Sequence, residues 1–198
     1  PRSRPFVFCI GLSKTATTSL NDALKILGFD AIHLPPITEV GTGGKIYLKW
    51  PWWVSKFDAA TDLSVAALFR ELHAEFPNAR FIYTTRDIDR WLDSCRRHFT
   101  VEMVRTRVRQ KNFWVLELTE AFYGSLVYDE DKYRAAFERH DEAVRAFFED
   151  SPDLLEVDLT KDPSWERLCA FLRKPVPDAA FPFSNRGSQP VTGSAGDE

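Results

Sequence analysis

One lysine and several hydroxyl side chains lie close together near the start of the chain, in the segment FVFCIGLSKTATTSL, residues 6–20. An apolar run ends at Gly11, and Lys14 comes three residues later. Four hydroxyl side chains follow it, on Thr15, Thr17, Thr18 and Ser19. Backbone N–H groups at the start of a helix and a lysine ammonium both stabilise negative charge. The segment therefore predicts an anion site between a strand and a helix, and the alternative, a turn whose threonines only cap the helix, requires no lysine.

The loop lacks a glycine that nucleotide triphosphatases need. A Walker A loop has the pattern G-x-x-x-x-G-K-[ST], but here Ser13 precedes Lys14 and Phe8 stands where the first glycine belongs. The aspartates near the predicted strand ends, Asp58, Asp62 and Asp87, do not follow an apolar run as a magnesium-binding acid normally does. These two observations disfavour a nucleoside triphosphatase.

The segment GLSKTATTSL resembles the 5′-phosphosulfate loop of the sulfotransferases, which is typically written around K-[ST]-G-T-[TS]. The resemblance implies that the donor is 3′-phosphoadenosine-5′-phosphosulfate (PAPS) and that the product is adenosine 3′,5′-bisphosphate. It also implies a donor contact from each residue of the loop, namely Ser13, Lys14, Thr15, Ala16, Thr17, Thr18 and Ser19. Ala16 stands where many members carry glycine, and we expect it to supply the same N–H if its φ angle is negative.

The same resemblance implies an arginine at a strand end and a serine eight residues later, which together hold the donor's 3′-phosphate. FIYTTRDIDRWLDS provides this pair as Arg86 and Ser94. Two helical turns separate the residues, so both can face the carboxyl edge of the sheet, where open α/β sheets bind ligands. Arg186, beside Gly187, is a third candidate for the phosphate, and a solvated arginine is the alternative there.

Sulfuryl transfer needs charge stabilisation at the leaving oxygen and a base for the acceptor hydroxyl. Lys14 and the loop amides meet the first need, so we expect a reaction without a metal. In vertebrate-type members a histidine at a strand end is the base, whereas VSKFDAATDLSV contains none and offers Asp62. Asp62 is our first candidate, a helix cap is its alternative role, and Asp58 and His33 are the reserves.

Short apolar runs alternate with helical patterns along the chain. We predict strands over residues 6–10, 29–34, 54–60, 79–85 and 154–159, and a loop over 35–53. Helical stripes follow at residues 17–27, 63–76, 88–95, 133–148 and 162–172, the last with Asp162 as its cap, whereas 100–128 is helix-like but poorly phased. This order predicts an α/β fold, namely a three-layer P-loop-type domain with a mainly parallel central sheet flanked by helices.

The length and composition of the chain limit the number of domains and the classes of partner that we expect. A chain of 198 residues with 44% hydrophobic content predicts one domain, residues 1–187, followed by a tail, 188–198, rich in glycine and serine. The net charge of −3 disfavours a nucleic-acid partner, and we expect no membrane span and a cytoplasmic location, although a leader removed before Pro1 stays open. Cys9, Cys95 and Cys169 lie far apart, which favours buried thiols over disulfides or zinc.

The acceptor is less well defined by the sequence. We expect a small alcohol, phenol or lipid-like molecule with a hydroxyl group. Candidates for an apolar acceptor pocket are Trp50, Trp52, Trp53, Phe57 and Phe99, and the alternative, more frequent for clustered tryptophans, is packing in the core or a lid. The arginines between Arg96 and Arg109 either attract an acidic acceptor or form a solvated helical face. Two other functions stay open, a small-molecule kinase that uses a nucleoside triphosphate and a non-catalytic nucleotide-binding module.

Overall fold

The computed structural model describes residues 5–183 of the chain. Its centre is a sheet of five parallel strands in the order β2-β5-β1-β6-β7. The strands are β1 (Val7–Cys9), β2 (Ala31–His33), β5 (Ala59–Thr61), β6 (Arg80–Thr84) and β7 (Leu154–Val157). The predicted α/β class and parallel sheet are confirmed, whereas the boundary predicted at residue 187 lies outside the described residues.

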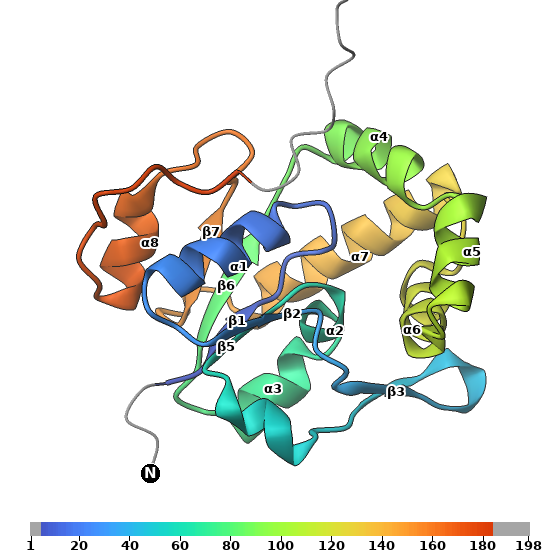
Figure 1. Cartoon of the computed structure of the whole chain (residues 1–198), viewed down its shortest axis with the longest axis horizontal. Helices are drawn as coiled ribbons and strands as arrows, with labels where there is room; N and C mark the ends of the chain where they lie inside the picture. Colours follow the sequence, from blue (N-terminus) through green and yellow to red (C-terminus); the bar gives the residue numbers. More distant parts are fainter. Residues whose placement is uncertain (1–4, 184–198) are drawn as a thin grey trace, which may run out of the picture.

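Helices cover both faces of this sheet and make three layers (Figure 1). On one face, α1 (Thr17–Ile26) and α8 (Trp165–Leu172) pack on Val7 and Cys9. On the other face, α3 (Phe69–Glu75) and α7 (Glu130–Phe147) pack on Phe8 and Phe81. Alternate strand residues point to opposite faces, so a strand covered on both sides must be apolar throughout, as 6–10 is.

The remaining helices form a third cluster beside the carboxyl end of the sheet (Figure 1). They are α2 (Leu63–Ala66), α4 (Ile88–His98), α5 (Val101–Arg109) and α6 (Phe113–Tyr123). Trp91 of α4, which is fully buried, packs against Tyr123 of α6 and Tyr133 of α7. This aromatic packing fixes α4, which carries residues from the predicted donor site, relative to the sheet.

Several predicted boundaries are wrong. Residues 35–53 contain an antiparallel hairpin, β3 (Thr38–Val40) and β4 (Ile46–Leu48), and two short 3₁₀ helices, η1 (Thr42–Gly44) and η2 (Trp52–Lys56). In the strand predicted over residues 54–60, residues 54–56 are therefore the end of η2, and the strand β5 begins only at Ala59. The helix expected over 63–76 divides into α2 and α3 at Leu68. Ser164, not Asp162, occupies the N-cap position of α8.

Candidate active site

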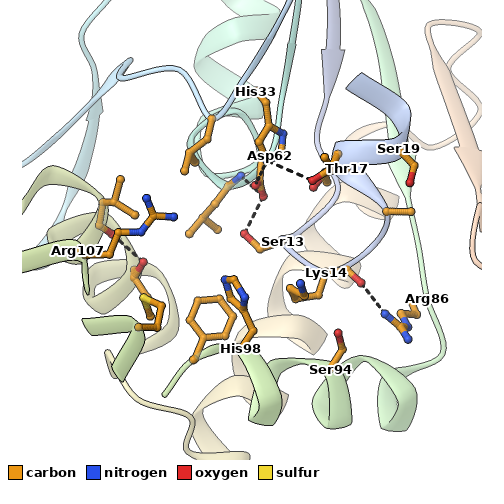
Figure 2. Close-up of a pocket in the computed structure, with 18 of the residues that line it drawn as sticks. Ser13, Lys14, Thr17, Ser19, His33, Asp62, Arg86, Ser94, His98 and Arg107 are labelled. Atoms are coloured by element: carbon orange, nitrogen blue, oxygen red, sulfur yellow. Dashed lines mark hydrogen bonds and ion pairs between the residues drawn. The ribbon is translucent and has the colours of Figure 1, made fainter. Parts of the chain in front are cut away.

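A cavity of about 750 Å³ opens at the carboxyl end of the parallel strands (Figure 2). The segments that follow β1, β2, β5 and β6 all contribute to its wall, and α4, α5 and α6 close the other side. Lys14, Arg86 and Ser94, which the sequence placed in one donor site, line this same cavity. The cavity lies where a parallel sheet usually binds its ligand, with β1 at the centre of the strand order.

The loop after β1 is held in place by contacts to its own backbone. The Nη1 of Arg86 donates to the carbonyl of Lys14 at 2.9 Å, and the indole Nε1 of Trp91 donates to the carbonyl of Ser13 at 2.8 Å. At Gly11, an added Cβ would lie 1.9 Å from Oγ1 of Thr84, so only glycine lets β1 and β6 approach here. These contacts leave the loop's amides preorganised rather than mobile.

Thr15 has a different role from its neighbours in the loop. Its buried hydroxyl donates to the carbonyl of Leu12 at 2.7 Å and lies 2.7 Å from Oγ1 of Thr84. The other six residues predicted for the donor loop line the cavity, whereas Thr15 does not. The side chain of Thr15 therefore stabilises the turn from its buried side, and only the backbone of Thr15 remains available to an anion.

Helix α1 starts in a backbone conformation that the sequence analysis did not anticipate. Ala16, the N-cap residue, has a φ of 69°, and Lys14 has a φ of 74°. The condition of a negative φ, under which alanine would replace glycine freely, is therefore not met at Ala16. The position needs the left-handed conformation that glycine adopts freely, and alanine adopts it at a cost. This positive φ explains why glycine is frequent at this position in the sulfotransferase pattern.

The start of α1 favours an anion. No side chain caps the helix, and its first turn contains no acidic residue. Lys14 lies beside it, and burial lowers the pKa of its ammonium, against the opposite effect of Asp62. An anion in the cavity would offset this cost of burying the charge, because it stabilises the charged form of the lysine.

Asp62 lies directly after β5 and points into the same cavity. Its Oδ1 accepts from Oγ of Ser13 at 2.7 Å and from the amide of Leu63 at 2.8 Å, and its Oδ2 lies 3.0 Å from Nε2 of His33. Burial alone raises the pKa of Asp62, but the contacts with His33, Ser13 and the Leu63 amide together hold it below its ordinary value. Asp62 is therefore an ionised carboxylate at neutral pH, and it also caps α2.

Of the two reserve candidates for the base, only His33 lies in the cavity wall. His33, at the end of β2, lines the cavity, and its Nδ1 lies 2.9 Å from Oγ1 of Thr61. Asp58 precedes β5, at the amino end of the sheet, and does not line the cavity. Arg186 lies outside the described residues.

Sequence reasoning named Arg107 only among the arginines that either attract an acidic acceptor or form a solvated face, and it missed His98 as a residue of the cavity. His98, at the end of α4, lines it, and the loss of surrounding water together with the charge of Lys14 lowers its pKa. Arg107, in the last turn of α5, lines the side that faces away from Arg86 (Figure 2). No local pattern marks His98 or distinguishes Arg107 from its neighbouring arginines, because only the packing of α4 and α5 brings the two residues to the sheet edge.

The aromatic wall also differs from the prediction. Of the residues proposed for the acceptor pocket, only Phe99 lines the cavity. Trp50 and Trp53 pack against the core, and Trp52 is 76% exposed. The apolar wall of the cavity is instead formed by Leu34, Leu63, Phe99, Met103, Trp114 and Val115.

The described residues offer neither a group of metal-ligating side chains nor a membrane-spanning helix. Within residues 5–183, no three His, Cys, Asp or Glu side chains group closely enough to hold a metal ion. Over the same range, no helix has both the length and the apolar character needed to cross a membrane.

Comparison with known proteins identifies the family. The family described as "Sulfotransferase domain" matches residues 6–189, which is nearly the whole chain. The chain belongs to the sulfotransferase domain family. Membership supports sulfuryl transfer as the general chemistry and a transferase as the class of enzyme.

One curated protein is similar to this sulfotransferase-family chain over most of its length. It is "Ava biosynthesis cluster protein M" of Aspergillus versicolor, 25% identical over 210 residues. The similarity covers 89% of this chain and 79% of the relative.

Proposed function

We propose that the protein transfers a sulfuryl group from PAPS to the hydroxyl of a small acceptor, and that it does so without a metal ion. One observation carries this proposal: the loop of Lys14 and the Arg86–Ser94 pair open onto one cavity at the sheet edge. In the sulfotransferases that the loop resembles, these two groups hold opposite ends of the donor. A cavity of about 750 Å³ falls within the range of small-ligand sites.

The polar groups of the cavity fit the two charged ends of PAPS. The uncapped start of α1 and Lys14 suit the sulfated end. At the other end, Nε of Arg86 is buried and has no hydrogen-bond partner among the described residues. A buried N–H without an acceptor is costly, and the oxygen of a 3′-phosphate would supply one.

Asp62 is the group that we propose as the base. A carboxylate offers about four acceptor positions, and Ser13, Leu63 and His33 engage three of them in Asp62. One position on Oδ2 remains for the hydroxyl of an acceptor. The low pKa of Asp62 does not prevent this role, because an alcohol oxygen becomes strongly acidic as its bond to sulfur forms.

The residues of the cavity account for the proton and the leaving group of the proposed transfer. The acceptor oxygen bonds to sulfur, its proton passes to Oδ2 of Asp62, and the bond from sulfur to the bridging oxygen breaks. Lys14 and the loop amides stabilise the electron pair that this oxygen keeps as part of the bisphosphate product. His33 contacts the carboxylate from the far side and acts as a positioning residue.

We also propose a cytoplasmic location. All three cysteines are buried and free. Buried thiols without a disulfide are typical of a reducing compartment.

A turnover assay tests the proposed function. The protein is mixed with sulfur-labelled PAPS and a panel of phenols and alcohols, with and without a metal chelator. We expect label on at least one acceptor at a rate that the chelator leaves unchanged, and a Lys14→Met variant about a hundredfold slower. Transfer that the chelator abolishes would contradict the metal-independent mechanism, and no transfer to any acceptor would contradict the proposed activity.

A further inference from the structure

The cavity contains a second positive end that the donor does not explain. Arg107 is half-buried and lines the cavity on the side opposite to Arg86, with Ser13 and Lys14 between them in Figure 2. The guanidinium of Arg107 points inward, toward Asp62 rather than out to solvent (Figure 2). A cation on this side faces the space beyond the base, where the acceptor must lie.

The neighbouring arginines of α5 show that the orientation of Arg107 is distinctive. Arg105 and Arg109 lie on the exposed surface and pair with Glu102, at 4.0 Å and 2.8 Å. Within the described part of the chain, no carboxylate lies within ion-pair distance of Arg107. The two outer arginines therefore share one carboxylate, whereas the inner one has none within this part of the chain and is available to a ligand.

The wall around Arg107 is apolar. Met103, Phe99 and Trp114 also line the cavity, and they come from α5, the end of α4 and α6, the helices that close the side opposite the strands. Asn112, between α5 and α6, adds an amide group. Asp62 is the one carboxylate among the residues described in the cavity wall, and it is already held by three contacts. An apolar space with a cation at its far end suits an apolar molecule with one anionic group.

We propose that the acceptor is a hydroxylated carboxylic acid, whose hydroxyl lies at Asp62, whose apolar body lies against Phe99, Met103 and Trp114, and whose carboxylate binds Arg107. This inference rests on the proposed function. A guanidinium binds a carboxylate in bidentate fashion, so Arg107 fixes the orientation of the acceptor as well as its charge. The reacting hydroxyl is then held toward Asp62, which lies between the two arginines.

A matched pair of acceptors tests this assignment. A hydroxyphenylpropanoate and the corresponding propylphenol differ in the carboxylate alone. Binding to the protein loaded with adenosine 3′,5′-bisphosphate is measured by calorimetry, and kcat/KM is measured with PAPS. We expect the acid to bind and react better than the phenol by on the order of tenfold or more, as a charged hydrogen-bonded pair allows.

Variants separate Arg107 from a general loss of activity. Arg107→Gln should remove the preference for the acid and leave kcat/KM for the phenol within about twofold, and Arg107→Lys should restore part of the preference. Arg105→Gln, on the exposed side of the same helix, is the control. It should change neither the preference for the acid nor kcat/KM for the phenol. Binding of the bisphosphate should be normal in all three variants.

Three outcomes would overturn the assignment: equal use of acid and phenol, an equal loss of both in Arg107→Gln, or no binding of either to the loaded protein. A loss of bisphosphate binding in Arg107→Gln would also overturn the assignment, because Arg107 would then bind the donor and not the acceptor. Failure of the unaltered protein to bind the bisphosphate would contradict the proposed function itself.

Discussion

Asp62 shows how one residue meets several demands at once. It caps α2, holds the hydroxyl of Ser13 beside Lys14, and contacts His33, all from a backbone with a φ of 85°. A positive φ combined with an extended ψ, here −171°, is strained in a residue other than glycine and persists only where its surroundings enforce it. The contacts of Asp62 supply this enforcement and point its remaining acceptor position into the cavity.

Replacement of Asp62 should separate chemistry from binding. We expect Asp62→Asn to lower kcat on the order of a hundredfold or more, because the amide cannot take the proton. Binding of adenosine 3′,5′-bisphosphate, measured by calorimetry, should change little. Asp58→Asn, at the opposite edge of the sheet, is the matched control and should keep full activity. Near-normal turnover in Asp62→Asn would exclude Asp62 as the base.

The sequence predicted the residues of the site that belong to local patterns. Lys14, Arg86 and Asp62 each lie shortly after one of the parallel strands β1, β6 and β5, so the sheet brings them to one edge. No pattern marks His98, and the sequence does not distinguish Arg107 from the other arginines of its basic stretch. The packing of Trp91 and Tyr123 decides where the helices of these two residues lie. The tryptophans misled the prediction, because an aromatic cluster in the sequence does not show whether it packs on the core or on a ligand.

At the scale of elements, the strand-to-helix turn from β1 to α1 carries a conformational cost. Ala16 has a φ of 69°, and the left-handed region costs an alanine roughly 1–2 kcal/mol relative to glycine. Glycine gains about 0.4–1 kcal/mol of extra freedom in the unfolded chain, which opposes the benefit. The relief of strain in the folded state is therefore larger than the gain of freedom in the unfolded chain.

Ala16→Gly should therefore stabilise the protein by about 0.5–1 kcal/mol, or about 2 °C in Tm for a chain of this size. Thermal unfolding checks this expectation. Ala23→Gly, in the buried interior of the same helix, is the control and should destabilise by about 1 kcal/mol or more. A lower Tm for Ala16→Gly would show that residue 16 does not adopt the left-handed conformation.

Elements with strong local signals were predicted well, and short ones were not. β1 and β6 are continuous apolar runs, and α1 and α4 have clear stripes, so their identity depends little on the rest of the chain. The hairpin of β3 and β4 consists of strands of three residues each, only half-buried, which form because they pair with one another and pack near α6. Such strands have no pattern long enough to recognise.

For the whole molecule, a buried histidine links stability to pH. Nε2 of His140 on α7 lies 2.8 Å from the carbonyl of Ile10, so α7 is tied to the end of β1. Burial lowers the pKa of His140 to about 4, below the ordinary value of 6.5. Between these two values the unfolded chain binds a proton that the folded chain does not. Stability is therefore full above the unfolded value and falls as pH drops below it.

We expect the free energy of unfolding to decrease by about 2 kcal/mol from pH 7 to pH 5 through His140. Urea unfolding at the two pH values measures this change. His98 has a lowered pKa and acts in the same direction, whereas the lowered pKa of Asp62 matters only below about pH 4. A His140→Gln variant should show a clearly weaker pH dependence, and an unchanged dependence would contradict this origin.

The central claim is that the loop of Lys14 and the Arg86–Ser94 pair hold the two ends of one donor. Calorimetric titration with adenosine 3′,5′-bisphosphate, compared with ADP plus magnesium, tests this claim without any knowledge of the acceptor. We predict clear preference for the bisphosphate, lost in Arg86→Ala and kept in Arg90→Ala, whose side chain lies outside the cavity wall. Preference for ADP with magnesium, or full bisphosphate affinity in Arg86→Ala, would contradict the claim.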